Sequence, residues 1–220
     1  ALAEKAGLAA LEMAGVDPGD LDLIIVATLT PDRLMPNTAC YVQRRIKARK
    51  AVCFDMEAAC SGFLYGLEVA GGLIRTGGYK NALVIGAEKL SAVTDWTDRS
   101  TCVLFGDGAG AVVLKATDPE NDAFVASRLG SDGSYTELLH IPAGGSALPA
   151  THDTLEKNLN FIHMTGREIF KLAVGAMVQA ANEVMEAAGL EAGQLRWLIP
   201  HQANTRIIQA VGKRLGLPEE

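Results

Sequence analysis

Aromatic residues, positive charge and long apolar runs are all scarce in this chain of 220 residues. Phe, Trp and Tyr together make up 5% of the sequence. No apolar stretch approaches the roughly 20 residues that a membrane-spanning helix needs. The net charge of −6 excludes a general electrostatic attraction to nucleic acid. With 49% hydrophobic and 21% charged residues, the composition predicts a globular protein of one or two domains that binds neither nucleic acid nor membranes.

Paired cysteines are also lacking. The four cysteines are Cys40, Cys53, Cys60 and Cys102. They show no paired spacing, and they form no metal-ligand pattern with the four histidines. The sequence therefore predicts free thiols, no metal site and a cytoplasmic location, where thiols stay reduced.

Glycine, in contrast, is abundant, with 23 residues, which favours close packing of helices on sheets. Apolar runs typical of buried strands occur at residues 23–27, 51–55, 82–86 and 109–115. Segments with helical periodicity separate the first three of these runs. Alternating helices and buried strands predict an α/β fold, with helices packed on mixed sheets.

Two segments of the chain resemble each other without gaps. Residues 12–21 match residues 186–195 at a constant offset of 174. In each copy a helix stops at a glycine, and a polar turn and a strand follow. Each strand, at 23–27 and at 197–199, precedes a further helix, expected at 38–47 and 205–215. The repeat predicts a duplicated fold.

Neither predicted half is whole. The polar segment 117–122 is the expected boundary, which gives a first half at residues 1–116 and a second at 123–220. The second half is expected to open with a strand at 123–129, to carry a long loop at 130–149 and to be incomplete. The chain is accordingly expected to be an internal piece of a longer protein.

Cys60 is the leading candidate for a catalytic residue. It lies between the strand at 51–55 and a helix expected to begin near Ser61. The N–H groups and the dipole at a helix start favour a thiolate and lower the pKa of a thiol, so Cys60 is predicted to be a nucleophile. The alternative is a buried packing residue, which is the interpretation adopted for Cys40, Cys53 and Cys102.

His201 is the second candidate. It follows the predicted strand at 197–199, and strand ends are where ligand crevices form in open α/β sheets. It lies 141 residues beyond Cys60, but equivalent positions in two repeated halves could bring the two residues together. The alternative is a structural histidine, which is the interpretation adopted for His140, His152 and His163.

Four motifs occur in a fixed order: Asp55–Phe63, Phe105–Ala111, Met164–Lys171 and Pro200–Asn204. Together they resemble β-ketoacyl-(acyl carrier protein) synthase III, the priming condensing enzyme of fatty-acid synthesis. This family has a duplicated, layered thiolase-like fold. The resemblance implies that an acyl-CoA primer condenses with malonyl-acyl carrier protein in a decarboxylative Claisen reaction through an acyl-Cys intermediate. It further implies a homodimer and no cofactor, because both thioesters are substrates.

The resemblance also implies roles for individual residues. Cys60 would carry the acyl group, and His201 would stabilise the enolate. Substrate contacts would come from Met35, Arg99, Leu104, Phe170 and Asn204, with Met35 lent by the partner subunit. A third catalytic residue, an asparagine in a later Gly-rich loop, is expected beyond this chain, and Asn204 is not that residue.

The basic residues of the predicted helix at 205–215 have two interpretations. Arg206, Lys213 and Arg214 could form a solvated face or bind an acidic carrier protein, as the resemblance implies. Two alternative functions remain besides the priming enzyme: a condensing enzyme of secondary metabolism with another acyl acceptor, and a cysteine hydrolase.

Two further patterns have structural interpretations. Residues 106–111 resemble a dinucleotide-binding fingerprint, but a strand follows them where that fingerprint needs a helix, so a tight turn is predicted. Thr165 and Glu168 predict a capping box at the start of a helix.

Overall fold

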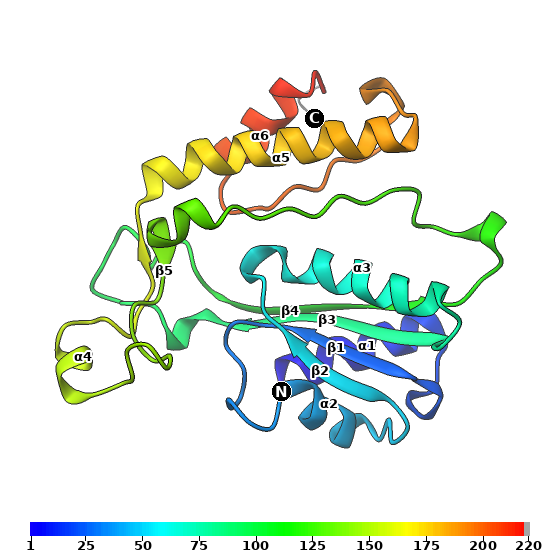
Figure 1. Ribbon diagram of the computed structural model, residues 1–220, viewed down its shortest axis with the longest axis horizontal. Helices are drawn as coiled ribbons and strands as arrows, with labels where there is room; N and C mark the ends of the chain where they lie inside the picture. Colours follow the sequence, from blue (N-terminus) through cyan, green and yellow to red (C-terminus); the bar gives the residue numbers. More distant parts are fainter. Residues whose placement is uncertain (218–220) are drawn as a thin grey trace. The chain divides into compact units, whose positions relative to one another are not determined.

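A four-stranded mixed sheet forms from the apolar runs of the first part of the chain (Figure 1). Its strands lie in the order β2-β1-β3-β4 and are β1 (Leu23–Ala27), β2 (Val52–Met56), β3 (Asn81–Lys89) and β4 (Asp107–Lys115). β2 and β3 run parallel to β1, and β4 is antiparallel to β3. The three parallel strands end at one edge of the sheet, which positions the loops that follow them.

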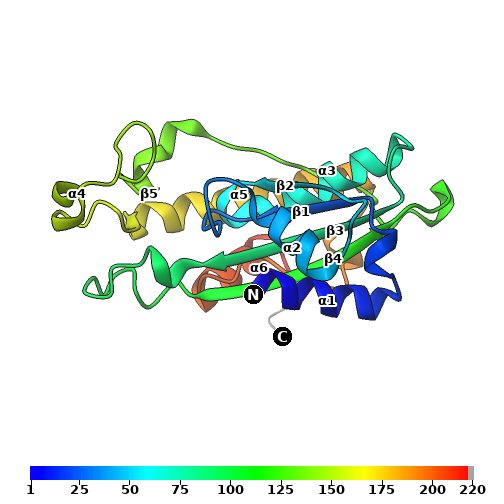
Figure 2. The same cartoon turned by 90° about the horizontal axis from the view of Figure 1, so that it is seen from below.

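Three helices cover this sheet: α1 (Leu2–Ala14), α2 (Thr38–Ile46) and α3 (Gly62–Arg75). In the two views, α3 covers one face and α1 and α2 cover the other (Figures 1 and 2). Alternate residues of β1 serve the two layers, with Ile24 and Val26 packed in the α1–α2 cluster and Leu23 and Ile25 in the α3 cluster. Burial of each such side chain contributes roughly 1.5–3 kcal/mol.

The computed structural model describes residues 1–217, which form two units. Unit 1 contains residues 1–90 and 106–124, and unit 2 contains residues 91–105 together with the chain from residue 125 onward. The end of the predicted second half, at 218–220, lies outside the described residues. The division of the chain at 117–122 into two thiolase-like halves remains a prediction.

Unit 2 is built around a long helix, α5 (Gly166–Ala188), which packs against α6 (Thr205–Arg214). A shared apolar cluster joins the two helices, with Val174, Ile207 and Val211 buried in it. A short helix, α4 (His152–Glu156), and a two-stranded antiparallel sheet of β5 (Leu139–His140) and β6 (His163–Met164) complete the unit. The α5–α6 pair positions the segment that contains His201.

The repeated segments adopt the same local structure. α1 and α5 both end at a glycine with left-handed backbone geometry, Gly15 at φ 61° and Gly189 at φ 65°. A 3-10 helix follows in each copy, at Pro18–Asp20 and at Ala192–Gln194. The predicted helix ends are thus confirmed, and glycine suits them because other residues are strained at positive φ.

Two predicted strands are absent. Residues 123–129 and 197–199 belong to no strand in the described part of the chain. A strand is stabilised by its ladder of hydrogen bonds to a neighbouring strand, and neither segment belongs to a sheet among residues 1–217. The predicted long loop at 130–149 is also partly ordered, since it contains a 3-10 helix at Gly133–Leu138 and strand β5.

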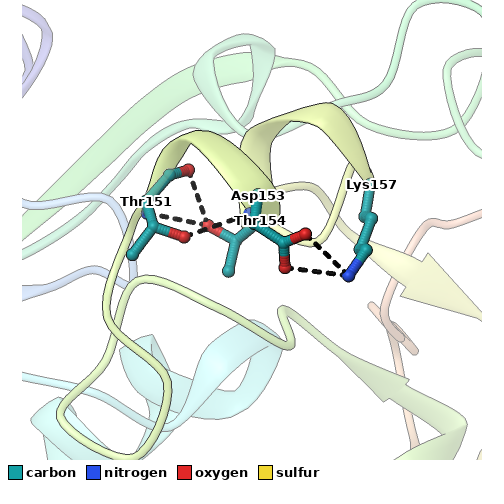
Figure 3. Close-up of polar contacts among 4 residues, drawn as sticks. All are labelled: Thr151, Asp153, Thr154 and Lys157. Carbon is teal, nitrogen blue, oxygen red and sulfur yellow. Dashed lines mark hydrogen bonds and ion pairs between the residues drawn. The ribbon is translucent and has the colours of Figure 1, made fainter.

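The capping box predicted at Thr165 is wrong. Thr165 is the N-cap of α5 but makes no side-chain cap bond. Its N–H donates to the carbonyl of Leu138 at 2.8 Å, which ties Thr165 to the end of the adjoining β5–β6 sheet. A capping box instead begins α4, where Thr151 and Thr154 bond reciprocally beside an ion pair of Asp153 with Lys157 (Figure 3).

Candidate active site

Cys60 lies in a short 3-10 turn, Ala59–Ser61, between β2 and α3. Its position directly before the helix is as predicted. The turn has an unusual backbone and lies close to the sheet. Ala59 has a φ of 44°, which is rare for a residue with a side chain, and a Cβ added to Gly62 would lie 3.1 Å from that of Ala27. The sequence therefore folds here into a sharp strand-to-helix bend that presents an exposed thiol.

The prediction that the helix start lowers the pKa of Cys60 is wrong. Although the residue is exposed, nearby protein atoms desolvate the sulfur and raise its pKa, and the negative charge of Glu88 raises it further. A hydrogen bond to the backbone N–H of Cys60 acts in the opposite direction. Neighbouring N–H groups are already occupied, because Ala59 donates to Glu57 at 2.8 Å and Ser61 donates to the carbonyl of Ala58 at 3.0 Å.

Glu88, near the end of β3, is a site residue that the sequence reasoning missed. Its carboxylate accepts hydrogen bonds from the Leu29 N–H at 2.8 Å, from the Thr28 hydroxyl at 3.3 Å and from the Thr30 hydroxyl. These donors belong to the loop after β1. Because β1 and β2 are parallel, this loop begins at the edge of the sheet where β2 ends. The sequence contained only part of the signal: alternation along β3 puts Glu88 on the same face as Val84, but only the folded structure shows that this face is covered by α3.

The candidate residues of unit 2 lie around α5 and α6. His201 is exposed in the segment before α6. The side chain of Asn204 caps α6 by accepting a hydrogen bond from the Ile207 N–H at 3.0 Å. Phe170 on α5 packs in the same apolar cluster as Ala203, so the structure brings the predicted pocket residue Phe170 beside the segment that carries His201 and Asn204.

The remaining candidates are exposed. Met35, in the loop between β1 and α2, has 85% of its surface accessible. Arg99 and Leu104 lie in the turn-rich segment 91–105 of unit 2 and are also exposed. Met35 and Cys60 belong to unit 1, and the other predicted site residues belong to unit 2. An exposed apolar side chain such as that of Met35 is consistent with a contact made in a larger assembly.

Unit 2 also contains a cavity of about 530 Å³ beside the two-stranded β5–β6 sheet. The side chains of His140 and His163 line it with their rings 6.0 Å apart, together with Asp95 and Asp98. Among residues 1–217, no group of three or more His, Cys, Asp and Glu side chains is arranged to hold a metal ion. The cavity is lined by none of the predicted catalytic or substrate-binding residues, so it does not define the candidate site.

No helix within residues 1–217 combines the length and apolar character that crossing a membrane requires.

Comparison with known proteins identifies sequence families that match both parts of the chain. A family described as 3-oxoacyl-[acyl-carrier-protein (ACP)] synthase III matches residues 54–133. The family describing the C-terminal part of such synthases matches residues 185–220. A β-ketoacyl-[acyl-carrier-protein] synthase III from Caldanaerobacter subterraneus subsp. tengcongensis is 52% identical over 219 residues, which cover 100% of this chain and 66% of that protein.

Solved structures show the same relationship. The 3-oxoacyl-[acyl-carrier-protein] synthase III from Aquifex aeolicus VF5 is 48% identical with a TM-score of 0.88, over 98% of this chain and 65% of that one. The priming β-ketosynthase of the R1128 polyketide pathway is 36% identical with a TM-score of 0.85, over 99% of this chain and 64% of that one. The chain thus spans about two thirds of the length of the relatives that it matches.

Proposed function

Because this chain belongs to the 3-oxoacyl-[acyl-carrier-protein] synthase III family, we propose that the whole protein starts fatty-acid synthesis by condensing an acyl-CoA primer with malonyl-acyl carrier protein. The observation that carries the proposal is the exposed Cys60 at a strained strand-to-helix bend. The chain that contains it has 52% sequence identity to a synthase of this name. The reaction needs no cofactor, since coenzyme A and the carrier protein enter as thioesters of the substrates.

In the first step, the sulfur of Cys60 attacks the carbonyl carbon of the acyl-CoA. A new carbon–sulfur bond forms, the bond to coenzyme A breaks, and the proton of the thiol passes to the departing thiolate. Thiolates suit this exchange because they are strong nucleophiles and good leaving groups. The bend supports the step because it fixes the sulfur at the end of the sheet.

In the second step, malonyl-carrier protein loses carbon dioxide, and the enolate that remains attacks the acyl-Cys carbonyl. The carbon–sulfur bond to Cys60 breaks, and the cysteine thiolate leaves and takes up a proton. We assign His201 as a donor to the enolate oxygen, a role that a neutral imidazole can fill. Its place before α6, next to the cluster that contains Phe170, supports this assignment.

Substrate contacts follow the same assignment. Arg99, Leu104, Phe170 and Asn204 would line the path of the coenzyme A or carrier arm, and Met35 would be contributed across a homodimer. The exposure of Met35 supports a contact outside its own subunit. Arg206, Lys213 and Arg214 are exposed on α6, where they would meet an acidic carrier protein.

A condensing enzyme of secondary metabolism is the second candidate. The likeness to the priming β-ketosynthase of the R1128 polyketide pathway favours it. The two candidates share the use of Cys60 and His201 and differ in the acyl acceptor. A comparison of carrier proteins from fatty-acid and polyketide synthesis as acceptors would separate them.

The test of the proposed function is covalent labelling of the whole protein. Incubation with a short acyl-CoA should add one acyl group, and peptide mass spectrometry should locate it on Cys60. Addition of malonyl-carrier protein should then release a β-ketoacyl product. Replacement of His201 by alanine should keep the acylation and slow the condensation about 100- to 1,000-fold, as expected when one oxyanion donor is lost.

Cys102→Ser is the matched control, since it removes a thiol that has no assigned role, and both steps should continue in it. Acylation at Cys53 or Cys102 in place of Cys60 would contradict the assignment of the nucleophile. An undiminished condensation rate in His201→Ala would remove His201 from the mechanism.

A further inference from the structure

The residues on the α3-facing side of β3 pack along α3 toward the turn that carries Cys60. Residues of this strand alternate between the two faces of the sheet, so Val84, Gly86 and Glu88 share one face. A Cβ added to Gly66 of α3 would lie 2.9 Å from Val84, and one added to Gly86 would lie 3.5 Å from the side chain of Phe63. Since α3 runs opposite to β3, the next step along both elements pairs Glu88 with the turn that carries Cys60.

The carboxylate of Glu88 is held in one position. Two hydroxyl groups and one N–H of the loop after β1 donate to it, from Thr28, Leu29 and Thr30. The Thr30 hydroxyl also accepts a hydrogen bond from the Lys89 N–H at 2.7 Å, and the Thr28 hydroxyl accepts one from the Thr30 N–H at 3.1 Å. These bonds join the loop to the end of β3, so the negative charge cannot swing away from the start of α3.

The other charged groups at this edge of the sheet are directed elsewhere. Asp55 accepts hydrogen bonds at the start of α2, from the N–H groups of Thr38 at 2.6 Å and Ala39 at 2.8 Å. Glu57 is occupied by the Ala59 N–H. Lys89 and its cross-strand partner Asp107 on β4 lie on the opposite face of the sheet from Glu88 by strand alternation. Glu88 is thus the carboxylate that β3 directs to the turn of Cys60, and its charge acts on the sulfur.

We propose that Glu88 is a positioning residue for the nucleophile: its carboxylate, held by the loop after β1, faces the turn that carries Cys60 and sets the charge environment of the sulfur. The consequence for turnover rests on the proposed function. A nearby negative charge disfavours the thiolate, so acylation starts from the thiol, whose proton leaves with coenzyme A. A thiol of higher pKa is also a poorer leaving group, which helps to retain the acyl group until the enolate arrives.

The test is the pH dependence of Cys60 alkylation by iodoacetamide in the whole protein, with the modified residue located by peptide mass spectrometry. Glu88→Gln removes the charge and keeps the size of the side chain. It should move the alkylation profile to lower pH and increase the rate at neutral pH several-fold. Glu12→Gln, which makes the same change of net charge on α1, should leave the profile unchanged.

Glu88→Asp separates charge from shape, because it keeps the carboxylate on a shorter side chain. Its profile should stay close to that of the parent protein. The proposal is overturned if Glu88→Gln keeps the parental profile, or if Glu88→Asp moves the profile as far as Glu88→Gln does, since Glu88 would then act only as an anchor for the loop.

The parent protein decides the question if the variants do not fold, as judged by circular dichroism. The proposal requires a midpoint of Cys60 alkylation above the ordinary pKa of cysteine, and a midpoint at or below that value overturns it. Alkylation requires neither acyl-CoA nor carrier protein. A shifted profile without any ketoacyl product would therefore contradict the proposed function and leave the role of Glu88 standing.

Discussion

Two cysteines only seven positions apart have different surroundings. Cys53, in β2, faces the α1–α2 side of the sheet, and Cys60 lies beyond the end of that strand at the surface. Desolvation raises the pKa of Cys53 to about 12, with smaller contributions from Cys40 and Asp55. Chemical selectivity between the two thiols therefore comes from access, since Cys60 is the more exposed of the two.

The raised pKa of Cys53 predicts a loss of stability at alkaline pH. Above the ordinary cysteine pKa, about 8.5, the thiol ionises in the unfolded chain and stays neutral in the folded one. The free energy of unfolding should therefore fall as the pH rises from that value toward about 12. Denaturant unfolding across this range should show a smaller decline in Cys53→Ala. An equal decline in both proteins would mean that Cys53 is not the group responsible.

The position of Cys60 could be predicted from the sequence, but its electrostatic environment could not. The strand, the bend and the helix follow from local patterns that span about 20 residues. The charge that acts on the sulfur comes from Glu88, 28 positions further along the chain, and its effect depends on how β3 pairs with β1. The missing information was strand order, which no local pattern contains.

At the scale of elements, α6 combines a buried apolar stripe with a basic exposed face. Ile207, Val211 and Leu215 are buried against α5, while Arg206, Lys213 and Arg214 are exposed. The spacing of four residues between the buried positions belongs to the apolar pattern that predicted this helix. The structure shows where the charges lie, and their use in binding remains a proposal.

Charge reversal on α6 tests that use. Arg206→Glu, Lys213→Glu and Arg214→Glu together should raise the KM for malonyl-carrier protein and leave the KM for acyl-CoA nearly unchanged. The effect should decrease as salt is added, because exposed charges are screened over about 10 Å at 0.1 M salt. Reversal of Arg44 and Arg45 on α2 is the matched control. Equal effects on both substrates would support a solvated face.

Elements that need distant partners are where the sequence predictions failed. The strands expected at 123–129 and 197–199 have suitable apolar residues, but a strand also requires a neighbour. β1, in contrast, is paired on both sides along its whole length. An apolar composition allows a segment to form a strand, but the segment forms one only if a neighbouring strand pairs with it.

For the molecule as a whole, the predicted fold class is confirmed, because solved synthases of this family have the same thiolase-like α/β fold. The shared local structure of the two repeated segments was visible in the sequence, since helix ends with glycine caps are local features. The assignment of residues 91–105 to unit 2 was not visible. This segment lies between two strands of unit 1, and only its contacts reveal where it belongs.

The two units should differ in stability. Within the described residues 1–217, seventeen buried residues form the two apolar clusters of unit 1, and five form that of unit 2. Trp197 and Ile199 are also largely exposed, at 77% and 81%. Hydrogen exchange of this chain should be slowest in β1 and β3, intermediate in α5 and fastest at residues 195–203. Uniform protection throughout the chain would contradict the difference.

At position 59, selection for stability and selection for a rigid bend at Cys60 would act in opposite directions. A residue with a side chain at positive φ costs roughly 1–2 kcal/mol, and glycine avoids this cost. Glycine would also loosen the bend that fixes Cys60. Evolution for thermal tolerance and evolution for rapid turnover would therefore favour different residues at position 59. A variant library selected for survival on heating would accumulate a substitution here that a library selected for growth would discard.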